Sequence, residues 1–175
     1  MSKLKVNSLI PVAGVGTDST TLKNGGGITQ IKQVQKTNTF STTSSSFTDV
    51  TGLSVSITPT VNTNKILVLV ETNSSTTGGN NAVFRLLRDS TPIAIGDNDS
   101  NRPAASFQQR INDTNAAMNG SINFLDSPAT TSEVTYKLQT FSQSSGVHIN
   151  KTFSDTDSTV IGRTFSSITV MEVSA

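Results

Sequence analysis

The sequence lacks cysteine and tryptophan, and it contains a single histidine among 175 residues. Without cysteine the chain has no disulfide framework, no thiolate metal site and no thiol nucleophile. Charged residues make up 14% of the chain, and the formal net charge is +1. Because no dense group of Lys and Arg stands out, we expect no electrostatic binding to nucleic acid or to an anionic membrane surface. Stability must come from packing and assembly.

Apolar residues are also scarce, since hydrophobic types account for 33% of the chain. No stretch approaches the roughly 20 apolar residues that a membrane-spanning helix needs, so membrane insertion is not expected. Ser, Thr and Asn fill the gap, which predicts a thin core unless subunits share one. The composition therefore points to an oligomer.

The longest aliphatic run is Ile-Leu-Val-Leu-Val at residues 66–70, within the stretch 64–73. Five residues is the length of a strand and not of a helix. Because the run is apolar at every position, both faces of this strand are expected to be covered, as in the middle of a sandwich core. An all-β domain built around residues 64–73 is the resulting prediction.

Further short β-prone segments follow residue 27, separated by turn signals at the spacing of sandwiches. In the predicted strand 53–57, Leu53, Val55 and Ile57 alternate with polar residues, and in the predicted strand 134–141, Val134, Tyr136 and Leu138 share one face. The polar stretch 97–115 is expected to be a long surface loop, and 88–92 the tip of a hairpin. The other predicted strands are 28–40 (anchored by Ile31 and Val34), 47–50, 82–87, 93–96, 117–124, 147–149 and 167–173.

The first 27 residues differ from the rest, with sparse apolar residues, scattered turn formers and a Gly-Gly-Gly joint at 25–27. The two interpretations are a disordered tail and an extended anchoring arm. The arm is favoured because its apolar residues exceed what a solvated linker needs. Pro11 and Gly14 interrupt the patch that could pass for a signal peptide, so a cytoplasmic product is expected. The predicted organisation is an arm at 1–27 and one β-sandwich domain at 28–175.

Five stretches occur in order after the Gly-rich joint. They read Q-V-Q-K-T-N-T-F, V-T-G-L-S-V-S-I-T-P, N-K-I-L-V-L-V, F-R-L-L-R-D-S-T-P-I and S-S-I-T-V-M-E-V. This order, with the short apolar arm before it, resembles the small jelly-roll modules of tailed-bacteriophage virion proteins, which are found at tail-fibre tips and on capsid surfaces. The resemblance covers residues 28–175. It implies an antiparallel jelly-roll sandwich similar to tumour-necrosis-factor-like domains, assembled as a homotrimer.

The resemblance also implies a structural protein of the virion, made in the host cytoplasm. The leading hypothesis is a tail-fibre or tail-tip adhesin, attached to other virion proteins through its arm and contacting a glycan or protein of the host surface. The alternative is a capsid decoration protein or head fibre anchored on the major capsid protein, and a third is a carbohydrate-active enzyme. The expected anchoring residues are Leu4, Val6, Leu9, Ile10, Pro11 and Val12, and the expected receptor-contact residues are Asp97, Asn98, Asp99, Asn101 and Arg102.

Catalytic and metal-binding patterns are weak. A serine triad needs a histidine base, and the one histidine, His148, stands between two aliphatic residues in a predicted strand. No G-x-S-x-G motif occurs, and no pair of carboxylates suggests a glycosidase. Residues 97–101 carry alternating oxygen ligands that calcium could use, but Arg102 and Gln108 break the EF-hand pattern. We therefore expect no catalytic residue, no metal and no other cofactor.

Overall fold

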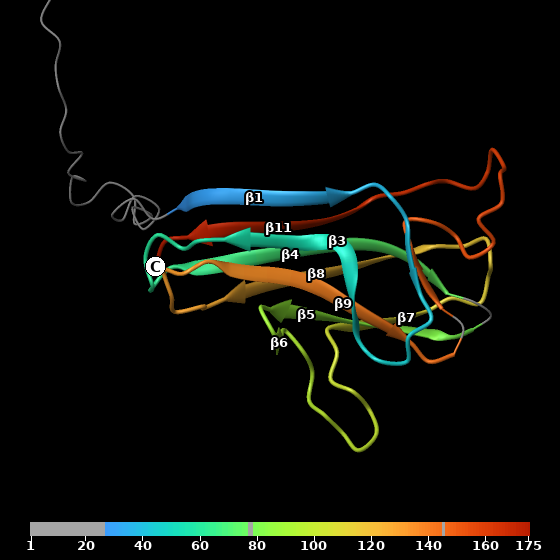
Figure 1. Cartoon of the computed structure of the whole chain (residues 1–175), viewed down its shortest axis with the longest axis horizontal. Coiled ribbons are helices and arrows are strands. Elements are labelled where there is room, and N and C mark those ends of the chain that lie inside the picture. The colour runs from blue at the N-terminus through green and yellow to red at the C-terminus, as the bar shows by residue number, and fades with distance from the viewer. Residues whose placement is uncertain (1–26, 77–78, 145) are drawn as a thin grey trace, which may run out of the picture.

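The computed structural model describes residues 27–76, 79–144 and 146–175, and these form an all-β structure of antiparallel sheets (Figure 1). The predicted arm at 1–27, with its anchoring residues, lies outside the described residues except for Gly27. Within the described part the strands are β1 (Ile28–Lys36), β2 (Phe40–Thr42), β3 (Thr48–Ile57), β4 (Lys65–Thr76), β5 (Asn81–Arg88), β6 (Thr91–Ile93), β7 (Phe107–Arg110), β8 (Met118–Asp126), β9 (Val134–Ser142), β10 (Val147–Ile149) and β11 (Ser166–Val173).

The first sheet, called sheet A here, is built around β4. Its strand order is β1-β11-β4-β10-β2, and β8 pairs with the other edge of β4. The twelve residues of β4 are long enough for two partners along one edge, β11 beside Lys65–Glu71 and β10 beside Ser74–Thr76. The prediction that 64–73 is the central strand is therefore confirmed.

The second sheet, sheet B, has the order β3-β9-β5, and both β6 and β7 pair with the far edge of β5. The hairpin predicted around residues 88–92 is present between β5 and β6, with Asp89 at a positive φ of 54° in its tip. The prediction of one continuous loop at 97–115 is wrong, because residues 107–110 form strand β7. It forms because the ring of Phe107 stacks on that of Phe84, with centroids 4.5 Å apart.

The core lies between the two sheets and follows the alternation of the strands. The three predicted inward residues of β3 and the three of β9 are all buried, as the sequence predicted. Across from them, β4 contributes three aliphatic side chains that are at most 1% exposed. The buried apolar cluster is Val50, Leu53, Val55, Ile57, Ile66, Val68, Val70, Ala82, Phe84, Leu86, Ile122, Val134, Tyr136, Leu138, Val147, Ile149, Ile168 and Val170.

The first predicted strand needs correction. It was expected to span 28–40 with Ile31 and Val34 as anchors, but β1 ends at Lys36 and a separate β2 begins at Phe40. Residues three apart in a strand point to opposite faces. Val34 accordingly packs against the core, whereas Ile31 points away from it and is 58% exposed. The separate segments predicted at 47–50 and 53–57 are one strand, β3, whose pairing with β9 shifts between Asp49 and Ser54.

The expectation that both faces of residues 66–70 are covered is wrong for the single chain. Ile66, Val68 and Val70 fill the core, but Leu67 and Leu69 stand on the outer face of sheet A and remain half-buried. The strand predicted at 93–96 is wrong except for Ile93, because β6 spans Thr91–Ile93 and Ala94 takes a positive φ of 52°. The remaining predicted strands are present, and their ends shift by no more than two residues. The strand near the C-terminus, β11, lies inside sheet A between β1 and β4, as expected.

A buried carboxylate joins three parts of sheet A at the end where β1 begins. Glu172 of β11 is fully buried and accepts hydrogen bonds from Gln30 Nε2 at 2.6 Å and Asn64 Nδ2 at 2.7 Å. The backbone N–H and the hydroxyl of Thr60 donate at 2.7 and 2.8 Å. Burial alone would raise the pKa of Glu172, but these donors outweigh burial and lower it to about 2.

A second polar cluster ties the two sheets together. Asp126, at the end of β8 in sheet A, accepts a hydrogen bond from the hydroxyl of Tyr136 in sheet B at 2.7 Å. The guanidinium of Arg88 in β5 lies 2.8 Å from both carboxylate oxygens of Asp126. Because Tyr136 is fully buried and bonded to a carboxylate, its pKa is raised well above the ordinary value. The cluster fixes how β8 sits over β5 and β9.

Glu172 should make stability depend on acid. Its pKa is about 2 in the fold and 4.5 as the reference value, so its contribution is complete above pH 4.5 and is lost as the pH falls toward 2. The variant Glu172→Gln places an amide among buried donors, and each donor left without an acceptor costs about 1–3 kcal/mol. We expect a lower midpoint of urea unfolding at pH 7 and a flatter acid dependence.

The control for this prediction is Glu71→Gln on β4, whose side chain is exposed. That variant should unfold like the wild type at each pH between 2 and 7. An equally acid-sensitive Glu172→Gln protein would show that Glu172 does not set the acid response.

Candidate functional site

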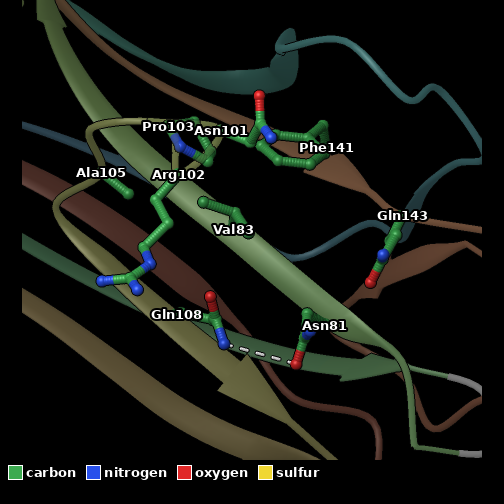
Figure 2. A pocket seen from close by; sticks show the side chains of 9 residues that line it. All are labelled: Asn81, Val83, Asn101, Arg102, Pro103, Ala105, Gln108, Phe141 and Gln143. Carbon is green, nitrogen blue, oxygen red and sulfur yellow. Dashed lines mark hydrogen bonds between the residues drawn. The ribbon is translucent and has the colours of Figure 1, made fainter. Parts of the chain in front are cut away.

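A pocket of about 420 Å³ lies on the outer face of sheet B, where the connection 94–106 between β6 and β7 folds over the strands. In Figure 1 this connection projects from the side of the sandwich, between its two ends. Figure 2 shows the pocket from close by, with the strand residues facing the tip of the connection. It is lined by Asn81, Val83, Asn101, Arg102, Pro103, Ala105, Gln108, Phe141 and Gln143.

The connection is held in one shape by its own hydrogen bonds. The N–H of Gly96 donates to the carbonyl of Ala105 at 3.1 Å, which closes the two arms of the loop. The N–H of Ala104 donates to Asn98 Oδ1 at 3.0 Å, and the N–H of Arg102 to the carbonyl of Asp99 at 2.9 Å. These bonds satisfy the backbone of a segment that lies outside the sheet.

A serine anchors the connection to sheet B. The N–H of Ser106 donates to the carbonyl of Phe84 at 2.8 Å, and its hydroxyl accepts from the N–H of Leu86 at 3.0 Å. Both partners belong to β5, so the loop is fastened at the base of the pocket. The rim of the pocket is thereby placed relative to the strands.

The pocket has an apolar floor. Val83 of β5 and Phe141 of β9 are cross-strand partners on the outer face of sheet B. The ring of Phe47 meets that of Phe141 edge-on at 4.7 Å, and the guanidinium of Arg85 lies 3.9 Å from the Phe47 centroid. These contacts hold the aromatic ring of Phe141 beside the pocket.

Carboxamides surround this floor. Gln108 Nε2 donates to Asn81 Oδ1 at 3.3 Å, as Figure 2 shows, while Gln143 and Asn101 stand on other sides. Arg102 supplies the one charged group of the lining and lies 2.9 Å from Asp99 Oδ2. An apolar floor with amide donors and acceptors around it suits a ligand that has both C–H faces and hydroxyl or amide groups.

The predicted receptor-contact residues separate into two groups. Asn101 and Arg102 line the pocket, whereas Asn98 and Asp99 use their side chains to hold the connection itself. Asp97 is outside the lining. The strand residues of the site were missed because sequence reasoning considered only the loop. The alternation of β9 was a usable signal, since the face opposite Tyr136 and Leu138 includes Phe141.

The calcium interpretation of residues 97–101 does not gain support from the geometry. Asn98 Oδ1 accepts from a backbone N–H, Asp99 Oδ2 faces Arg102, and Asp99 Oδ1 accepts from the hydroxyl of Ser100. Their oxygens therefore already serve the loop. Among the residues that the structure describes, no group of three or more His, Asp or Glu side chains could hold a metal ion.

His148 lies next to a serine, because β10 pairs with β2. Ser41 Oγ is 2.9 Å from His148 Nδ1, and the His148 ring meets Phe153 at 5.2 Å between centroids. Burial lowers the pKa of His148, and the positive charge of Lys151 lowers it further, whereas the negative charge of Asp155 raises it. Nε2 is buried and has no hydrogen-bond partner in the described part of the chain. The ring thus lacks the third group that orients the base in a serine triad.

Two carboxylates, Asp49 and Asp89, line a second cavity of about 510 Å³ at the register shift between β3 and β9. Asp49 accepts hydrogen bonds from Lys137 Nζ at 2.8 Å and Gln139 Nε2 at 2.6 Å. Burial would raise the pKa of Asp49, but these donors and the charge of Lys137 lower it. Asp89 Oδ1 accepts from the N–H of Thr135 at 2.9 Å. This arrangement keeps Asp49 ionised, whereas a glycosidase acid needs a raised pKa.

No protein-family model matches the chain, and a search of curated proteins finds no match either. Within the described residues, no helix is long and apolar enough to cross a membrane. The site therefore has to be interpreted from its own geometry.

The shape of the pocket rim should depend on Asn98. In Asn98→Ala the N–H of Ala104 loses its acceptor, and a hydrogen bond of about 1 kcal/mol corresponds to roughly fivefold faster local opening. Hydrogen–deuterium exchange of a peptide that covers 96–105 should rise by about this factor. Asn101→Ala is the control, since its side chain lies at the pocket and makes no hydrogen bond to the residues that the structure describes. Equal exchange in the two variants would contradict this account of the rim.

Proposed function

We propose that this chain is a non-enzymatic structural protein of a tailed-bacteriophage particle, folded as a jelly roll and assembled as a homotrimer. The pairing order supports the jelly roll, because β1-β11-β4-β8 and β3-β9-β5-β7 are the pairing paths of the two sheets. Each path interleaves strands from both halves of the chain, as a doubly wound pair of Greek keys does. The segment 1–27 attaches the trimer to other virion proteins.

The pocket on sheet B carries the proposal of a host-contact role. A sugar ring presents C–H groups on its faces and hydroxyls around its edge, and the pocket presents Val83 and Phe141 surrounded by carboxamides. Arg102 adds a charged donor at the rim. The ligand class that this lining fits best is a glycan of the host surface, contacted by an adhesin at the tail.

Three copies of the pocket would act together. The polar rim of one pocket offers a few hydrogen bonds to a ligand, and each such bond contributes about 1 kcal/mol. Three pockets on one trimer raise the effective concentration of the second and third contacts, which offsets weak single contacts. The proposed place of action is the virion, after synthesis in the host cytoplasm.

One observation favours the alternative role as a capsid decoration protein or head fibre. The pocket connection projects from the side of the sandwich, while β1 begins and β11 ends together at one end (Figure 1). A fibre-tip adhesin is expected to place its contact loops at the opposite end. A protein that stands on a capsid could instead present a side-facing pocket to its surroundings.

Binding should weaken when the polar rim is removed. The double variant Asn101→Ala and Arg102→Ala deletes two exposed side chains of the lining, and we expect about tenfold weaker binding to host surface polysaccharide. Arg163→Ala is the control, since this exposed arginine lies outside the pocket. Binding would be measured by surface plasmon resonance on immobilised polysaccharide from the host. Unchanged binding of the double variant would remove the pocket from the proposal.

The location on the particle decides between the two roles. Immunogold labelling with an antibody raised against the whole chain should place gold at the tail if the protein is an adhesin. Gold over the head would establish the decoration role and remove the host receptor from the proposal. Particles without label would contradict the virion assignment altogether.

A further inference from the structure

The outer face of sheet A carries a row of four apolar side chains that no part of the described chain covers. The strand register places them side by side, because Ile31 pairs with Met171, Met171 with Leu67, and Leu67 with Leu125. Ile31 is 58% exposed and Leu125 is 47% exposed, at the two ends of the row. The residues directly before and after Leu67 in β4 face the core. The row, called the outer apolar row here, is thus a surface of its own.

On one side, the outer apolar row is flanked by a row of uncharged side chains. The next row across the same strands reads Gln33, Thr169, Leu69 and Asn123, and none of these side chains is charged. The nearest outward charges on β4 are Lys65, one row away from Leu67 on one side, and Glu71, two rows away on the other. Subunit interfaces typically have an apolar centre with few charges, surrounded by a polar rim.

The two outer faces of the sandwich differ in a way that supports this interpretation. On sheet B the ion pair of Lys137 with Asp49 and the hydrogen bond of Arg85 to Gln139 cover the surface, together with the 94–106 connection. These groups favour contact with water or with a polar ligand. In a chain that is 33% hydrophobic, placing aliphatic side chains outward on sheet A is costly unless they are covered.

We infer that the outer face of sheet A is the surface through which copies of this chain meet around the trimer axis. The inference rests on the proposed homotrimer and identifies its interface. From strand spacing and rise, the face between Lys65 and Asn73 across four strands measures roughly 20 by 30 Å, or about 600 Å² in projection. This approaches the ~800 Å² that each partner contributes to an interface of standard size.

The position of Gly27 favours a second copy as the occupant. At the end of the β1–β11 pair the N–H of Ser174 donates to the carbonyl of Gly27 at 3.0 Å, and the N–H of Gly27 donates to the hydroxyl of Ser174 at 3.3 Å. The neighbouring pair Ile28 and Val173 extends the apolar surface. Gly27, the first residue that the structure describes, thus lies at this edge of the sheet. Copies joined through sheet A bring their Gly27 residues to one end of the assembly. With these ends together, all copies of one assembly can attach to the same place on the particle.

Charge placed in the outer apolar row should break the assembly. Ile31→Lys together with Leu125→Lys changes side chains that are largely exposed in one chain, so each subunit should still fold. The matched control is Ile95→Lys, which alters an exposed isoleucine on the opposite side of the sandwich, in the connection over sheet B. Light scattering of the full chain should give trimers for the wild type and the control, and monomers with unchanged circular dichroism for the double variant.

Thiol labelling gives a second readout, because the chain has no cysteine of its own. In the assembled protein, Leu125→Cys should react with a maleimide about tenfold more slowly than Ile95→Cys, and the two should react equally in denaturant. A trimer in which both cysteines react equally fast would overturn the interface and leave the trimer standing. A wild-type chain that is monomeric at micromolar concentration would overturn the homotrimer itself, and the interface with it.

Discussion

The division of β4 into two chemically different faces is the constraint on which the rest of the structure depends. Its inward aliphatic side chains pack against sheet B, and its backbone pairs with β8 on one edge and with β11 and β10 on the other. In the described part of the chain only β5 also has three partners, and two of these, β6 and β7, are short strands of three and four residues. Because β4 fixes the register of all three partners, it also fixes which side chains face the core and which face outward.

Polar side chains determine how the two sheets are held at their ends. The Glu172 cluster joins β1 and β11 to the turn before β4, and the Asp126 cluster joins the end of β8 to sheet B. At the other end, Asn150 takes a positive φ of 62°, donates to the carbonyl of Lys36 at 2.8 Å and accepts from Ser166 at 2.6 Å. A chain with little apolar material thus uses buried hydrogen bonds to specify one arrangement of its strands.

Strand periodicity predicted most of the fold because it depends on local alternation. The inward residues of β3 and β9 could be read directly, since Leu53, Val55 and Ile57 alternate with polar neighbours. The pocket could be predicted only in part. Asn101 and Arg102 lie in a polar loop that stands out in the sequence, whereas Phe141 joins them through the pairing of β9 with β5, which no local pattern encodes. The exposure of Ile31 was missed because an isolated isoleucine in a strand does not reveal which face is covered.

The irregular edge strands have a consequence for behaviour at high concentration. β1 carries a bulge between Ile28 and Gln30 and an exposed Lys32, and β3 breaks its register near Gly52, where φ is 89°. Bulges and lysines at sheet edges oppose the flat strand-to-strand stacking from which amyloid-like fibrils grow. Crowding of many copies is therefore not expected to produce open-ended association through the edges of the sheets.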